Sequence, residues 1–110
     1  MGQEKRASTR YNVAVQMDVT HDGAMASGLT VNLSLGGALV RVPAEPPLRV
    51  GDRVEVSFRL PDLDKPLAAK AEVRWVDDGD GEIAGLQFVT GFRAKETWAL
   101  GRFLERQSPL

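Results

Sequence analysis

The chain contains no cysteine among its 110 residues. A disulfide framework and a thiolate-bound metal site are therefore excluded. The single histidine, His21, has no serine or carboxylate spaced to make it a catalytic base, and we interpret it as a solvated turn residue. A glycine-rich phosphate loop of the Walker type is also missing. We therefore expect a protein that is not an enzyme and that holds no cofactor.

Long apolar runs are missing too, although a membrane-spanning helix needs about 20 mainly apolar residues. The first ten residues lack the apolar core of a secretory signal. A net charge of −1 does not supply the basic surface on which general nucleic-acid binders rely. These absences predict a cytoplasmic protein that neither inserts into a membrane nor binds nucleic acid.

The charges that are present are unevenly distributed. Lys5, Arg6 and Arg10 make the N-terminal segment basic, and residues 77–82 form an acidic patch. An anionic ligand is therefore expected at the N-terminal segment. The acidic patch lacks the spacing of an EF-hand loop, and its Asp-Gly-Asp-Gly run is typical of a hairpin turn, so we expect no metal site there.

Apolar and polar residues alternate over most of the chain, which is the period of half-buried strands. Leu29, Val31 and Leu33 share one phase and are expected to face the core. The expected strands are residues 11–20, 29–33, 38–42, 53–60, 69–75 and 83–90.

After Phe92 the apolar period becomes helical, with Leu100, Phe103 and Leu104 on one face. We expect an all-β fold, a six-stranded antiparallel β-barrel followed by one C-terminal α-helix, because closing the sheet removes its exposed edges. The 110 residues should form a single domain. Its expected parts are a flexible N-terminal arm at 1–10, the barrel at 11–90 and the helix at about 94–106.

Two arginines, Arg6 and Arg10, form an RxxxR pattern directly before the first expected strand. The planar guanidinium can donate two hydrogen bonds to guanine O6 and N7, or two to a phosphate. By itself, the pattern is more typical of a basic, solvated N-terminal tail.

A second polar pattern, NxSxxG, ends the second expected strand. Asn32 and Ser34 are two residues apart, so on a strand they project to the same face, opposite Leu33. Gly36 and Gly37 are expected to supply backbone freedom for the turn and to let a flat ligand approach. In isolation, this pattern is more typical of a polar turn between two strands.

Together, Arg6, Arg10, Asn32, Ser34 and Gly37 resemble the PilZ domain family, whose signature is RxxxR followed by [D/N]xSxxG. The VRW and GLQF segments, the strand order and the closing helix are also similar to that family. The resemblance covers nearly the whole chain, and the two motifs are specific when they occur as a pair.

The resemblance implies a bacterial receptor for the second messenger cyclic di-GMP, acting as a stand-alone adaptor for an unidentified downstream protein. Arg6 and Arg10 would clamp the phosphates and guanines. Asn32 and Ser34 would form the platform on the barrel surface, and Gly37 the tight turn.

Four further residues are weaker candidates for ligand contact. Lys5 precedes the clamp, and Gly36 lies in the turn. Arg41 fits a solvated strand end equally well. Trp75 shares the phase of Ala71 and Val73, which favours a core position over contact with a base.

Two other functions remain open. A PilZ-like module of the pilus or motility machinery would bind protein and no nucleotide. A small barrel that binds single-stranded nucleic acid would need a charged groove and stacking aromatics. The net charge of −1 and the small number of aromatic residues, two Trp, one Tyr and four Phe, count against the latter.

Overall fold

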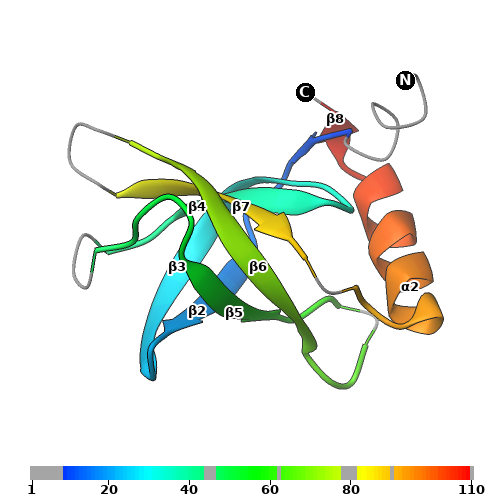
Figure 1. Ribbon diagram of the computed structural model, residues 1–110. Coiled ribbons are helices and arrows are strands. Elements are labelled where there is room, and N and C mark those ends of the chain that lie inside the picture. Colours follow the sequence, from blue (N-terminus) through cyan, green and yellow to red (C-terminus); the bar gives the residue numbers. More distant parts are fainter. Residues whose placement is uncertain (1–8, 44–46, 62, 78–81, 90, 110) are drawn as a thin grey trace.

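The computed structural model describes residues 9–43, 47–61, 63–77, 82–89 and 91–109. Almost all of this chain is strand or connecting turn, with one helix near the C-terminus in the described part (Figure 1). The elements are β1 (Tyr11–Asn12), β2 (Gln16–His21), β3 (Ala24–Leu33), β4 (Gly37–Arg41), β5 (Arg53–Phe58), β6 (Leu67–Val76), β7 (Ile83–Phe88), α2 (Ala94–Glu105) and β8 (Ser108–Pro109).

The six long strands form a closed antiparallel barrel. They follow the order β2-β5-β6-β7-β4-β3, and β3 pairs back with β2. The short strand β1 adds to the end of β3, and β8 pairs with β1 in turn. The expected six-stranded barrel with a C-terminal helix is thus confirmed, and the short pair β1–β8 is an addition that the alternation did not predict.

Alternation explains why the barrel has a single core. On β5, Val54, Val56 and Phe58 are buried, and the residues between them face outward. Helix α2 lies across one end of the barrel and buries Leu100 and Leu104 against that core (Figure 1). The helix boundaries agree with the predicted 94–106 to within one residue.

The first expected strand is divided in the structure. β1 ends at Asn12 and β2 starts at Gln16. Between them, the Thr30 hydroxyl donates to the Val13 carbonyl at 2.6 Å and accepts from the Val15 amide at 2.8 Å. A continuous strand over 11–20 was therefore a wrong prediction, because the Thr30 side chain takes over hydrogen bonds that a strand ladder would have made.

The apolar phase predicted for β3 is wrong as well. Leu29 and Val31 are 49% and 36% exposed, whereas Thr30 is 3% exposed. The register of β3 against β4 shifts by one residue between Thr30 and Asn32. This β-bulge reverses the alternation, so that Leu33 faces the core while Leu29 and Val31 do not.

His21 is the last residue of β2 and not part of the turn itself, which is made by Asp22 and Gly23 with positive φ angles of 52° and 81°. Its side chain is 23% exposed, and Nε2 lies 3.6 Å from a carboxylate oxygen of Asp52. The solvated turn position that we predicted is therefore corrected to a partly shielded position at the end of a strand.

Within the described residues, no helix is both long and apolar enough to cross a bilayer. The described part of the chain also contains no cluster of three potential metal-ligating side chains. Most of the acidic segment 77–82, where we expected no metal site, lies outside the described residues.

Candidate functional site

One row of cross-strand neighbours crosses the outer face of four barrel strands. Asn32 of β3 is opposite Leu39 of β4, Leu39 is opposite Gly85 of β7, and Gly85 is opposite Trp75 of β6. All four residues line a surface hollow of about 620 Å³. That volume falls within the range of small-molecule sites, roughly 300–1,000 Å³.

Arg10 closes the β3 side of this hollow. It directly precedes β1, and the pairing of Asn12 with Asn32 brings the start of β1 alongside the second motif. Arg10 Nη1 donates a hydrogen bond of 2.9 Å to Asn32 Oδ1, and Asn32 is 7% exposed. The structure therefore joins one residue of each sequence motif directly, across 22 positions of chain.

Ser34 organises the turn at the rim of the hollow. Its hydroxyl accepts hydrogen bonds from the amides of Gly36 and Gly37, at 3.1 and 3.0 Å, and donates one to the Gly37 carbonyl at 3.3 Å. The residue is 3% exposed. The hydroxyl therefore makes its hydrogen bonds within the turn and stabilises the loop between β3 and β4.

Gly37 is needed for space and not for backbone freedom. Its φ is not among the positive values of the described residues, and neither is that of Gly36. A Cβ atom on Gly37 would lie 2.1 Å from the Leu86 carbonyl oxygen of β7, whereas one on Gly36 would meet only the Ser34 hydroxyl, at 3.9 Å. The expected conformational role is therefore corrected: glycine at position 37 lets β4 and β7 approach.

Trp75 lies on the outer face and not in the core. It is 50% exposed, and the register of β6 against β7 shifts by one residue between Val73 and Trp75. Without that β-bulge, Trp75 would share the inward phase of Val73, as the sequence favoured. The indole instead packs next to Gly85, whose position leaves room beside the ring.

The charges of the hollow suit an anion. Arg10 and Arg74 contribute two guanidinium groups, and no carboxylate is found among the described residues that line it. Asn32 and Gln87 add amide groups, and Trp75 adds an aromatic surface. Arginine, amide and aromatic groups around one cavity can bind a phosphorylated ligand that also carries planar bases.

Comparisons with known proteins identify the family of the chain. A family model described as "PilZ domain" matches residues 4–106. The chain belongs to the PilZ domain family. No curated protein matches the chain at a significant level.

Several solved structures have a similar fold, including the following two. The Bacillus subtilis inhibitor of motility, MotI/DgrA, aligns with a TM-score of 0.74 and 19% identity, over 89% of this chain and 48% of that one. The PilZ domain of CeSA, from a cellulose-synthesizing bacterium, aligns with a TM-score of 0.66 and 19% identity, over 87% and 94% of the two chains. This PilZ domain therefore spans about half the length of the MotI/DgrA chain.

Some predicted site residues of the PilZ domain are not brought to the hollow by the described structure. Lys5 and Arg6 lie outside the described residues. Arg41 is exposed at the end of β4, where it pairs with Ile83 and Leu29, and it does not line the hollow. Gly36 does line it, at the rim.

Other lining residues were missed by the sequence analysis. Leu39 and Gly85 form the floor, and Arg74 Nη1 donates to Gln87 Oε1 at 3.1 Å on the wall formed by β6 and β7. Arg74 directly precedes Trp75 in the VRW segment, and this adjacency to a candidate residue was the feature of the sequence that could have pointed to Arg74. Strict alternation placed the two residues on opposite faces, and only the bulge puts both on the outside.

Proposed function

We propose that this PilZ domain binds cyclic di-GMP in the hollow between Arg10 and Trp75. The hydrogen bond from Arg10 to Asn32 carries the proposal, because it links the RxxxR and NxSxxG motifs at the edge of a cavity whose described lining residues include no carboxylate. Arg6 and Arg10 act as the clamp, and Asn32 is the amide at the barrel surface.

Arg10 is held in position before the ligand arrives. Ordering a long side chain costs up to about 2 kcal/mol, and the bond to Asn32 has already met that cost in the free protein. The other N–H groups of the guanidinium remain able to donate. Hydrogen bonds to charged groups contribute about 1.5–3 kcal/mol each, so a ligand with two phosphates and two guanines can reach micromolar affinity, roughly −8 kcal/mol.

Ser34 and Gly37 serve the same site by shaping it. The Ser34 hydroxyl holds the turn, and Gly37 allows β4 to lie against β7. Together they support the pairing of β3 with β4 that sets Asn32 opposite Leu39 in the hollow. Lys5 and Gly36 are secondary candidates for contact with the phosphates.

The bound ligand, the arm and the covered barrel face form a new surface, and we propose that a downstream protein in the cytoplasm binds it. One structural neighbour is named as an inhibitor of motility. A partner in the motility machinery is therefore the first to test once nucleotide binding has been measured.

The experiment is isothermal titration of the folded protein with cyclic di-GMP, with GMP and cyclic di-AMP as controls. We expect saturable binding of cyclic di-GMP alone and a loss of about 100-fold in Arg10→Ala, since at least one pair of charged hydrogen bonds is removed. Arg41→Ala is the matched control, because Arg41 is an exposed arginine on the same outer face but outside the hollow.

Unchanged affinity in Arg10→Ala would refute the clamp. No binding at high micromolar ligand would instead favour the second function, a PilZ module that binds only protein. Capture of a partner by the nucleotide-free domain would then support that function.

A further inference from the structure

We propose that Arg74 contributes to the selection of guanine over adenine beside the arginine clamp, by reading the edge of a base whose face lies on Trp75. This inference rests on the proposed function, since it assigns a role within the same hollow. It concerns the wall formed by β6 and β7, where neither signature motif contributes a residue.

The bulge in β6 makes the pairing of these two side chains possible. Consecutive residues of a regular strand point to opposite faces of the sheet. The register shift between Val73 and Trp75 breaks that rule, so that Arg74 and Trp75 are both exposed and both line the hollow. A planar base stacked on the indole would therefore have its edge next to the guanidinium of the preceding residue.

Gln87 holds the guanidinium on this wall. Arg74 Nη1 donates to Gln87 Oε1 at 3.1 Å, and Gln87 also lines the hollow. Among the described residues, no carboxylate forms an ion pair with Arg74. Its remaining N–H groups are thus oriented but not neutralised, as a base-reading arginine requires.

Space for the base comes from Gly85. A Cβ atom at this position would lie 3.4 Å from Trp75 Cβ and 3.9 Å from Leu39 Cδ1. Glycine leaves the floor between Leu39 and Trp75 open at that point. A flat ring system can therefore approach the indole from the side of β7.

The chemistry of arginine favours guanine. Guanine presents two acceptors, O6 and N7, on the edge that a guanidinium fork matches, whereas adenine presents a donor beside N7. Arginine has donors only, so one of its N–H groups would face an amino group in the adenine complex. Lysine keeps the charge but lacks the fork.

The test measures coupling between Arg74 and one atom of the ligand. Wild type, Arg74→Ala and Arg74→Lys are titrated with cyclic di-GMP and with its 7-deazaguanine analogue, which lacks N7. Wild type should bind the analogue more weakly, and this loss should be smaller in Arg74→Ala, which should bind cyclic di-GMP about 10- to 100-fold more weakly than wild type does. Arg74→Lys should not restore the difference, and competition with cyclic di-AMP should show a reduced preference for guanine in both variants.

Arg41→Ala serves as the control for removal of an exposed arginine and should behave as wild type. If removal of N7 weakens binding equally in wild type and Arg74→Ala, the assignment of Arg74 is overturned while the proposed receptor function stands. If wild type does not bind cyclic di-GMP at all, both are overturned. Circular dichroism of each variant verifies that the barrel has folded.

Discussion

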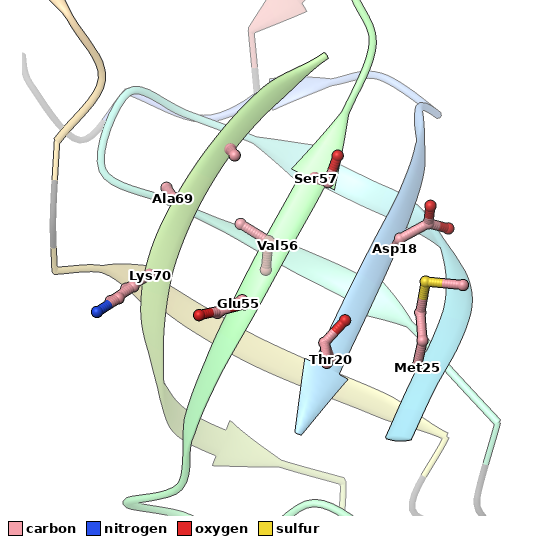
Figure 2. Close-up of a pocket in the computed structure, with 9 residues that line it drawn as sticks. Asp18, Thr20, Met25, Glu55, Val56, Ser57, Ala69 and Lys70 are labelled. Carbon is pink, nitrogen blue, oxygen red and sulfur yellow. The ribbon is translucent and has the colours of Figure 1, made fainter. Parts of the chain in front are cut away.

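Two hollows on the outer wall of this barrel have similar size and different charge. The first, between Arg10 and Trp75, has a volume of about 620 Å³, and its described lining has two arginines and no carboxylate. The second, of about 500 Å³, lies over β2, β5 and β6 and is lined by Asp18 and Glu55 together with Lys70 (Figure 2). Size alone therefore does not distinguish a binding site on this protein.

Strand register explains the difference between the two hollows. The pairings of β2 with β5 and of β5 with β6 proceed without a shift, so small and charged side chains such as Asp18, Ser57 and Ala68 alternate outward in a regular pattern. The pairings of β3 with β4 and of β6 with β7 each contain one bulge. These two bulges aim Asn32 and Trp75 into the same hollow.

Strand β6 shows the contrast within one element. Its first half contributes Ala68 and Lys70 to the second hollow, over β2, β5 and β6. Its second half, after the bulge, contributes Trp75 to the candidate site. One strand thus carries a polar outer face and an aromatic one. The extra residue of the bulge, between Val73 and Trp75, turns Trp75 to the outer face.

The largest effect should come from Gly37, which sits where β4 meets β7. Gly37→Ala places a Cβ atom 2.1 Å from the Leu86 carbonyl oxygen. The strands must separate locally, and we expect a loss of about 3 kcal/mol in the free energy of unfolding. Thermal denaturation would show this as a fall in Tm of about 10–15 °C.

The neighbouring glycine is the matched control for that substitution. Gly36→Ala meets only the Ser34 hydroxyl, at 3.9 Å, so its stability should stay within about 0.5 kcal/mol of wild type. Equal Tm values for the two variants would show that Gly37 is not required by the close approach of β4 and β7.

A smaller effect, on binding, is expected from Trp75. Stacking of a base on an aromatic side chain contributes about 1–3 kcal/mol, so Trp75→Ala should weaken cyclic di-GMP binding about 10- to 100-fold in a titration. Trp98 on α2 is the control, because it is 64% exposed and lies outside the hollow. Trp98→Ala should leave the affinity unchanged.

Fluorescence gives an independent test of the same contact. In a Trp98→Phe background, cyclic di-GMP should quench the remaining tryptophan emission, because the base stacks on Trp75. Emission that does not change at saturating ligand would mean that the base does not lie on the indole.

The smallest effect on binding is expected from substitutions in the second hollow, over β2, β5 and β6. Asp18→Asn and Glu55→Gln remove its two carboxylates. Because these carboxylates carry the same negative charge as the ligand's phosphates, we expect the ligand not to bind there, so each substitution should change cyclic di-GMP affinity by less than about 2-fold. Each variant should retain its stability within about 0.5 kcal/mol. A gain in affinity of 5-fold or more would show that the ligand also uses this hollow, and the contrast between the two faces would fail.

The sequence was sufficient for the features that depend on local pattern. Alternation along β5 predicted a strand whose buried and exposed residues are those observed. Helical spacing placed Leu100 and Leu104 against the core and located α2 to within one residue. Both patterns come from the geometry of a single element, which every residue in that element obeys.

The two motifs were also visible in the sequence, but their physical roles were only partly so. Asn32 was expected on the outer face of the barrel, and it lies there in contact with Arg10. For Ser34 and Gly37 the sequence predicted a turn. It could not show that the hydroxyl serves that turn, or that the glycine makes room for β7.

What the sequence by itself determined is the barrel with its helix, the PilZ resemblance and the basic character of the arm. What only the tertiary structure decided is which side chains share the hollow. A bulge depends on how two strands match each other, and one extra residue reverses every side chain that follows it. The positions of Leu29 and Trp75 were therefore set by the pairing of one strand with the next, β3 with β4 and β6 with β7, a relation that the periodicity of a single strand does not contain.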